Sequence, residues 1–139
     1  MGGTLVLETT FLVDLERERH RKIEGPAHRF LETLPEDRLS VTIVTAGELA
    51  AGAGEDERLG WERLVGSLDV LEIDLDVCWS YGRAYRYLQA NGLLIGTSDL
   101  WIASIALTRN LPLVTRKVKH FRRVPGLRVI GYADEETMP

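Results

Sequence analysis

Residues 4–15 read TLVLETTFLVDL, and this stretch decides the fold class. Its first four residues form a short apolar run, which is typical of a parallel strand buried on both faces of a sheet. Phe11, Leu12 and Leu15 then recur at helical spacing, so a helix is expected directly after the strand. The change of period predicts a strand that leads straight into a helix, the basic unit of an α/β domain.

The same alternation continues along the chain. Further strands are predicted at residues 39–44, 70–73, 111–114 and 127–130. Helices are predicted at 27–34, ended by Pro35, and at 55–65, 74–89 and 99–107, where Asn91 and Gly92 end the third of these as αL residues. Thr45 and Glu48 have capping-box spacing at another helix start, and Ser98 is expected to cap the helix at 99–107. The pattern predicts a three-layer α/β domain with a mostly parallel sheet, formed as a single domain by residues 1–139.

Composition excludes several protein classes. With 45% hydrophobic and 7% aromatic residues, the chain is unlike a disordered one. It has no apolar run near the ~18 residues of a membrane span and no signal-peptide pattern, so a cytoplasmic protein without membrane contact is expected. Cys78 is the only cysteine, which rules out an intrachain disulfide. Beside Trp79, it is expected to be a small buried hydrophobe.

The net charge of −4 hides an uneven distribution. Residues 100–130 contain seven basic residues and no acid, so they carry +7. The rest of the chain, with 10 basic and 21 acidic residues, carries −11. Such asymmetry points to a polyanionic or acidic partner, or to a solvated basic face that complements acidic helices.

Three acids follow the predicted strands. Glu8 ends the first strand, Glu48 lies in the helical turn after the second, and Asp99 opens a helix. Because sites in open parallel sheets form at the carboxyl ends of strands, these acids are expected to converge on one crevice. Converging carboxylates repel unless a positive charge lies between them, and their oxygens suit Mg²⁺ or Mn²⁺.

Two of the acids also have a purely structural interpretation. Glu48 would complete the capping box with Thr45, and Asp99 would complement a helix dipole. Glu8 is harder to explain in this way, because a charge at the end of a buried strand is costly without a partner. Capping and metal binding can coexist, so both interpretations stay open.

Other chemistries find less support in the sequence. There is no glycine-rich phosphate loop with its lysine and no serine in a GxSxG elbow. The three histidines, His20, His28 and His120, show no metal-ligand spacing. The tryptophans lie on apolar helix faces, where core or interface packing is the expected role.

Four blocks together resemble a known family: LVLETTFLVDL at 5–15, SVTIVTAGELAAG at 40–52, IGTSDLWIASIAL at 95–107 and LPLVTRKVKHFRRVPGLRVI at 111–130. In this order, and over nearly the whole chain, they resemble the PIN-domain ribonucleases, in particular the VapC-like toxins of toxin-antitoxin pairs. The resemblance implies that Glu8, Glu48 and Asp99 are catalytic residues that bind one or two Mg²⁺ or Mn²⁺ ions. It also implies that Thr10 and Thr115 line the site.

The resemblance further implies an RNA substrate, cut by a metal-activated water, together with a cognate antitoxin and a homodimer. The basic stretch would then hold the RNA backbone through Arg116, Lys119, Arg122 or Arg123.

Two residues depart from the family pattern. The first acid is usually aspartate, and Glu8 is longer by one methylene. Lys117 lines the site where many members carry an acid or an amide. Its ammonium could pair with Glu8 or Asp99 in place of a metal, or swing outward and bind phosphate.

The leading hypothesis is therefore a Mg²⁺- or Mn²⁺-dependent endoribonuclease toxin. One alternative is a degenerate, non-catalytic PIN domain that binds RNA or a partner protein. Another is a different metal-dependent phosphoesterase or a DNA nuclease on the same architecture, because fold does not fix substrate.

Overall fold

A computed structural model describes residues 3–34 and 38–133 of the chain. The strands in these residues are β1 (Thr4–Leu7), β2 (Arg38–Thr42), β3 (Asp69–Leu71), β4 (Leu113–Val114) and β5 (Val129–Ile130). The helices are α1 (Thr9–Arg21), α2 (Pro26–Glu32), α3 (Ile43–Ala51), the 3₁₀ helix η1 (Glu55–Glu57), α4 (Arg58–Gly66), α5 (Leu75–Ala90), α6 (Thr97–Thr108) and α7 (Val118–Phe121). Strand and helix alternate along most of the chain, as the sequence predicts.

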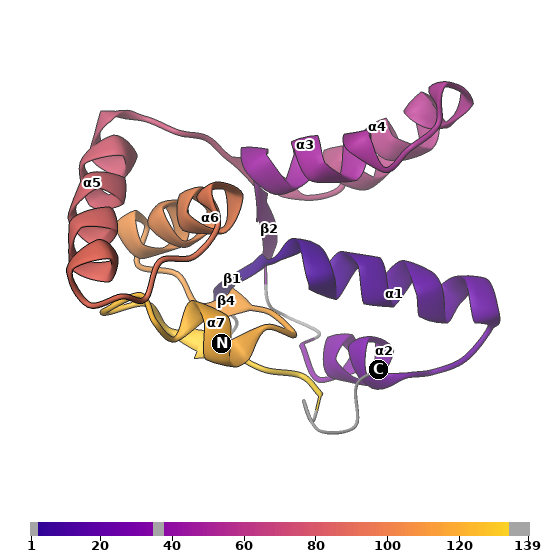
Figure 1. Ribbon diagram of the computed structural model, residues 1–139. Helices are drawn as coiled ribbons and strands as arrows, with labels where there is room; N and C mark the ends of the chain where they lie inside the picture. The colour runs from indigo at the N-terminus through magenta and orange to yellow at the C-terminus, as the bar shows by residue number, and fades with distance from the viewer. Residues whose placement is uncertain (1–2, 35–37, 134–139) are drawn as a thin grey trace.

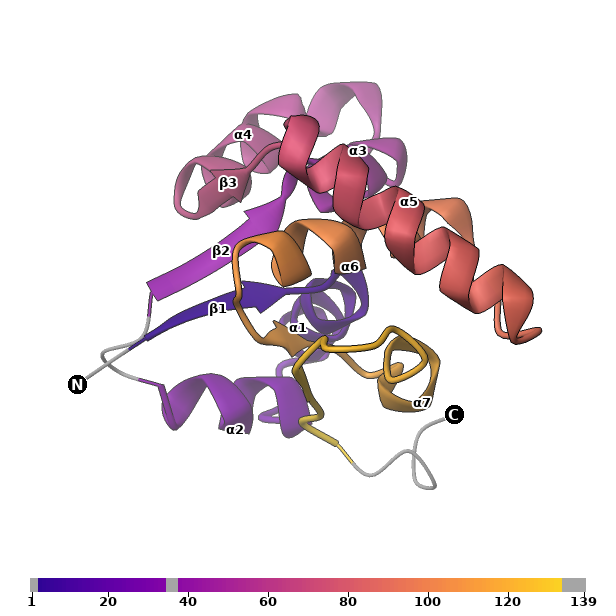
Figure 2. The ribbon, with the colours of Figure 1, turned by 90° about the vertical axis from the view of Figure 1, so that its left-hand side faces the viewer.

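The strands form one parallel sheet in the order β3-β2-β1-β4-β5. β1 lies in the middle, with Val6 opposite Ser40 on one side and opposite Leu113 on the other. Figure 2 shows β1 and β2 side by side between the helices. The strand order reverses between β1 and β4, and such a switch point is where ligands bind in open α/β sheets.

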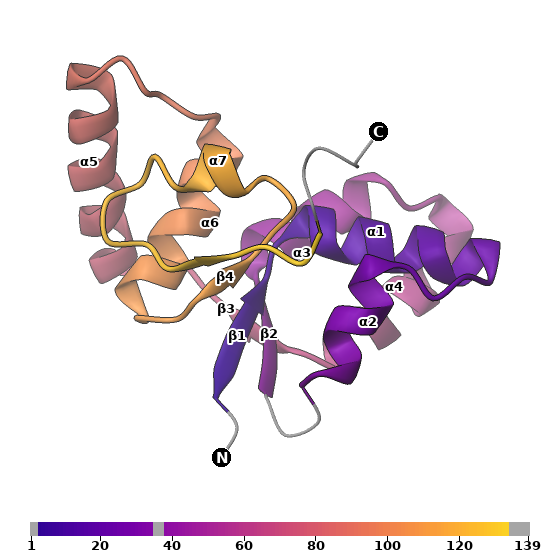
Figure 3. The same ribbon diagram turned by 90° about the horizontal axis from the view of Figure 1, so that it is seen from below.

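The residues of β1 alternate between two cores. Val6 belongs to a cluster with residues of α5, α6 and the segment around α7, whereas Leu5 and Leu7 pack with Phe11 and other residues of α1 and α2. Figure 3 shows α5, α6 and α7 on one side of the strands and α1 and α2 on the other. The three-layer α/β/α prediction is confirmed, because successive side chains of a strand point to opposite faces and both faces are covered here.

Two predicted helix caps are wrong. β2 ends at Thr42, whose hydroxyl accepts a hydrogen bond from the Thr45 backbone N–H at 3.0 Å. Thr42, not Thr45, is therefore the N-cap of α3, and Glu48 is free of the predicted capping box. Gly96, not Ser98, is the N-cap of α6, and its helix begins at Thr97.

Several strand and helix ends also shift. β4 covers only Leu113–Val114, the second half of the predicted 111–114 strand. The first half contains Pro112, which has no N–H to donate. β5, its partner, is equally short, and α4 begins only after the 3₁₀ turn η1. Gly92 has a positive φ of 66°, but Asn91 does not. Pro35, the predicted end of the second helix, lies outside the described residues.

α5 shows why the prediction for Cys78 is wrong. Val77, Ala84 and Leu88 form the buried face of this helix. Cys78 is one residue further along than Val77, which turns it by about 100°, and its side chain is exposed. Trp79 follows and is 66% exposed, so it is not a core residue. No helix among residues 3–34 and 38–133 is both long and apolar enough to cross a bilayer.

The corner between α1 and α2 is held by a buried carboxylate. Glu18 of α1 accepts hydrogen bonds from the backbone N–H groups of Ala27 and His28, at 3.0 and 2.9 Å. It therefore satisfies the first turn of α2, which lacks intrahelical partners. Gly25 lies directly against this carboxylate, since a Cβ there would stand 2.5 Å from the Glu18 Cδ. Figure 1 shows the loop that joins the right-hand end of α1 to α2, which lies below α1 in this view.

We expect Gly25→Ala to lower the free energy of unfolding by about 1–3 kcal/mol. The added methyl group would push the Glu18 carboxylate away from the two N–H groups that it caps, and buried donors would lose their acceptor. Urea denaturation, followed by circular dichroism, measures the change.

Gly60→Ala is the matched control. Gly60 lies in α4 with open space around its Cα, so alanine is expected to stabilise the helix by about 0.5–1 kcal/mol. Wild-type stability in Gly25→Ala would contradict the capping role of Glu18.

Candidate active site

The site is centred on Glu8, at the carboxyl end of the central strand. Glu8 follows β1 directly and is the N-cap residue of α1, with 1% of its surface exposed. Burying a charged carboxylate is unfavourable unless hydrogen bonds replace its water. Two hydrogen bonds to Glu8 come from Thr10, which follows β1, and from Thr115, which follows β4.

The hydroxyl groups of Thr10 and Thr115 hold one oxygen of Glu8. Each donates to Glu8 Oε1 at 2.5 Å, Thr10 from the first turn of α1 and Thr115 from the residue after β4. Because each hydroxyl has one proton, both protons are used on Glu8, and the 3.4 Å approach between the two hydroxyls is not a hydrogen bond as well. The other oxygen of Glu8 accepts no hydrogen bond from the described residues.

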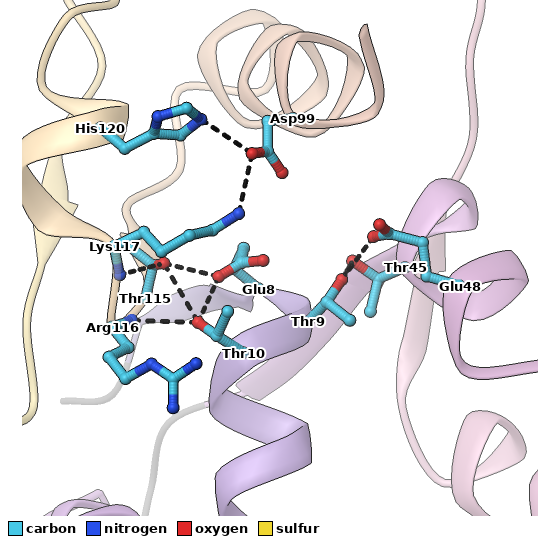
Figure 4. Close-up of polar contacts among 10 residues, drawn as sticks. All are labelled: Glu8, Thr9, Thr10, Thr45, Glu48, Asp99, Thr115, Arg116, Lys117 and His120. Atoms are coloured by element: carbon cyan, nitrogen blue, oxygen red, sulfur yellow. Dashed lines mark hydrogen bonds and ion pairs between the residues drawn. The ribbon is translucent and has the colours of Figure 1, made fainter. Parts of the chain in front are cut away.

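Backbone N–H groups fix these two hydroxyls in turn. Arg116 N donates to Thr10 Oγ1 at 3.1 Å, and Lys117 N donates to Thr115 Oγ1 at 3.0 Å. The start of α1 is thereby tied to the loop after β4, as Figure 4 shows. The two predicted site-lining threonines are thus the direct supports of the first acid.

Asp99 lies in the first turn of α6, and two basic side chains contact it. Its Oδ2 atom is 2.8 Å from Lys117 Nζ and 2.8 Å from His120 Nε2. A carboxylate only accepts hydrogen bonds, so the proton of the imidazole is assigned to Nε2. Of the two alternatives for Lys117, the structure has the ion pair with Asp99.

Glu48 lies on α3, and a third threonine contacts it. Thr9 Oγ1 donates to Glu48 Oε1 at 2.6 Å and is 3.0 Å from Thr45 Oγ1. Thr9 and Thr10 are neighbours at the start of α1, so one turn of backbone carries the supports of both Glu8 and Glu48. Figure 4 shows Asp99, Glu8 and Glu48 on three different elements around this turn.

The donor set fits a hard divalent cation by its chemistry. The three carboxylates offer oxygen ligands, and in the described part of the chain each keeps one oxygen that accepts no hydrogen bond. As the side chains stand, no three His, Cys, Asp or Glu residues among those described form a group that could hold a metal ion. Glu8, Glu48 and Asp99 would have to approach one another to share an ion.

A second polar cluster lies one helical turn after Thr10, and no sequence pattern predicts it. Asp14 is buried in α1, with Arg116 Nη1 at 2.9 Å from its Oδ1 atom and the Tyr132 hydroxyl at 2.5 Å from its Oδ2 atom. The phenol donates its proton to Asp14. Burial, and then the hydrogen bond to Asp14, hold the pKa of Tyr132 well above its usual value of 10.0.

The cluster assigns Arg116 a contact inside the protein. Its guanidinium pairs with Asp14 while its backbone N–H holds Thr10, so the residue positions the supports of Glu8. The other predicted RNA-binding residues, Lys119, Arg122 and Arg123, lie exposed on and just after α7. His120 was not predicted as a site residue, because nothing in the sequence pairs it with Asp99.

Comparison with known proteins gives matches over most of the chain. The PIN domain family matches residues 5–127. Ribonuclease VapC1 of Haemophilus influenzae strain R2866 is 34% identical over 128 residues, which cover 88% of this chain and 93% of the relative. The tRNA(fMet)-specific endonuclease VapC of Salmonella typhimurium strain LT2 is 30% identical over 99 residues, 66% of this chain and 74% of that one. The structure of VapBC-1 from nontypeable Haemophilus influenzae matches with a TM-score of 0.80 at 32% identity, over 94% of this chain and 99% of the matched one.

Tyr132 makes stability depend on pH in a defined direction. Below pH 10 the phenol is protonated in the folded and the unfolded chain. Above pH 10 the unfolded chain releases the proton while the folded chain keeps it, so stability is lost as pH rises. We expect the advantage of wild type over Tyr132→Phe, measured by urea denaturation, to shrink by up to about 1 kcal/mol between pH 9 and 11, since Tyr132 is only half-buried.

The comparison with the phenylalanine variant cancels the titration of other groups, because both proteins contain them. An advantage that stays constant or grows over this pH range would show that the Tyr132 hydroxyl does not donate to Asp14.

Proposed function

The chain belongs to the PIN-domain family, in its VapC branch, and on this premise we propose that it is a Mg²⁺- or Mn²⁺-dependent endoribonuclease, the toxin of a toxin-antitoxin pair. The observation that carries the proposal is the position of Glu8, Glu48 and Asp99. They come from three elements and lie around the start of α1, with Glu8 buried at the switch point of the sheet. A buried carboxylate held at such a place is expected at a reactive site.

The three carboxylates are the residues that would hold the divalent ion. An ion bound there would supply Lewis-acid chemistry, which neutralises charge on the scissile phosphate and favours ionisation of the attacking water. The chain's own contribution is to position the ligands. Thr10 and Thr115 fix the Glu8 carboxylate, Thr9 fixes Glu48, and α6 presents Asp99 at its N-terminus.

The residues after β4 are proposed to bind the RNA backbone. Arg122 and Arg123 follow α7 immediately and are exposed, and Lys119 lies exposed on that helix. α7 also carries His120, which contacts Asp99, so these cations lie within a few residues of the site. Their contacts would be with phosphate, which makes RNA binding weaker at higher salt.

A cognate antitoxin and a homodimer complete the proposal. The name VapBC-1 of the matched structure supports the antitoxin partner. Exposed apolar side chains on α5 support self-association, since Leu75 and Trp79 lie one turn apart and are 86% and 66% exposed. Electrostatic complementarity favours a basic antitoxin segment, because the chain outside residues 100–130 is acidic.

One observation favours a second candidate, a PIN domain that binds RNA or a protein without cutting. The ion pair between Lys117 and Asp99 places an ammonium on one of the three carboxylates. A cation fixed there in all conditions would leave the site without an ion that activates water.

We expect the purified chain, freed of any antitoxin, to cut RNA in the presence of Mg²⁺ or Mn²⁺. Asp99→Asn is expected to lower the single-turnover rate by roughly a hundredfold, because the amide is a neutral and weaker ligand at a site that depends on exact placement. Gel electrophoresis of an end-labelled RNA measures the rate, and DNA of the same sequence tests the alternative nuclease.

Asp76→Asn is the matched control, because Asp76 is an exposed acid in the first turn of α5. Cleavage that persists in EDTA, or an Asp99→Asn variant as fast as Asp76→Asn, would contradict the proposed mechanism. An RNA that is bound but left intact by the wild type would favour the non-cutting candidate.

A further inference from the structure

Lys117 is held in place at three points. Its backbone N–H donates to Thr115 Oγ1, the hydroxyl that supports Glu8. Its ammonium pairs with Asp99 Oδ2 at 2.8 Å and lies 5.5 Å from the centroid of the Phe121 ring, within the range of a cation–π contact. Figure 4 shows the side chain passing between Glu8 and Asp99. The lysine ammonium therefore faces Asp99 in the site.

The site gathers negative charge, and Lys117 is a cation that lies close to it. Glu8, Glu48 and Asp99 are three acids whose repulsion needs a nearby positive charge. Arg116, the neighbouring cation in the sequence, is directed to Asp14. His120 contacts Asp99 as well, but it is charged only when protonated. Lys117 thus places an ammonium directly on Asp99, one of the three acids.

The ion pair between Lys117 and Asp99 is also partly protected from solvent. The Asp99 side chain is 14% exposed and that of Lys117 is 38% exposed. A charge pair at such a depth is screened less than one on the surface. A divalent ion that uses Asp99 meets a like charge at close range, and the Coulomb repulsion lowers its affinity unless the lysine moves away.

We infer that Lys117 is the built-in counter-cation of the carboxylate site: it holds Asp99 when no divalent ion is bound, and it competes with such an ion for the site. The inference rests on the proposed metal-dependent function and adds that Lys117 lowers the affinity of the site for the divalent ion. Metal binding then has to overcome the repulsion of the Lys117 ammonium or displace it, so the chain binds the ion more weakly than it would with a neutral residue at position 117.

Calorimetric titration with Mn²⁺ tests this without relying on activity. Lys117→Met keeps an unbranched side chain beside Phe121 and removes the charge. We expect Lys117→Met to bind Mn²⁺ about tenfold more tightly than wild type, which corresponds to about 1.4 kcal/mol. Lys22→Met is the matched control, because Lys22 is exposed at the far end of α1, and its affinity should equal that of wild type.

Thermal unfolding gives a second readout. A ligand that binds only the folded chain raises Tm, and it raises Tm more when it binds more tightly. Mn²⁺ is therefore expected to raise the Tm of Lys117→Met more than that of wild type. Lys117→Gln, whose amide can still donate to Asp99, serves the same purpose if the methionine variant does not fold, with the same direction of change.

The outcomes separate the inference from the function on which it rests. Equal or weaker Mn²⁺ binding in the Lys117 variants, with clear binding in wild type, overturns the inference and leaves the metal-dependent nuclease intact. Absence of Mn²⁺ binding in all of the variants and in wild type overturns both. Tighter binding in Lys22→Met as well would assign the effect to net charge and would overturn the role of position 117.

Discussion

The burial of one carboxylate, Glu8, is the constraint on which the rest of the site depends. A charge at the end of the central strand is stable only if the chain supplies hydrogen bonds there. Thr10 and Thr115 supply them from both sides of the switch point. The loop after β4 must then lie against the start of α1, which brings Lys117 and His120 to Asp99.

The same constraint explains how three acids coexist. Each carboxylate has its own donors: threonines for Glu8, another threonine for Glu48, and a lysine and a histidine for Asp99. Behind them, Asp14 pairs with Arg116 and accepts a hydrogen bond from Tyr132. The ion pair directs the arginine side chain to Asp14 and not to the three site acids. The small net charge of −4 is thus the sum of an acidic body and a basic segment, and the two segments meet at the site.

The sequence predicted the fold class and the three elements that present Glu8, Glu48 and Asp99, because periodicity and strand ends are local signals. Among the described residues, the three acids as they stand do not form a group that could hold a metal ion. The sequence failed where a contact joins distant polar residues. Asp99 and His120, or Asp14 and Tyr132, are far apart along the chain and form no repeating pattern. Local details also shifted: Thr42 outcompeted Thr45 as the cap of α3, and one residue of helical rotation exposed Cys78. The first error arises because α3 begins directly after β2, at Ile43, and the second because Val77 takes the buried position of α5.

The central claim is that Glu8 and Asp99 act as one catalytic unit, and a double-mutant cycle tests it most directly. Single-turnover RNA cleavage would be measured for Glu8→Gln, Asp99→Asn and the double variant. If the two carboxylates serve one ion and one step, each single change removes most of the rate and the double variant loses little more. Losses that multiply in the double variant, or a single variant with the wild-type rate, would contradict the account.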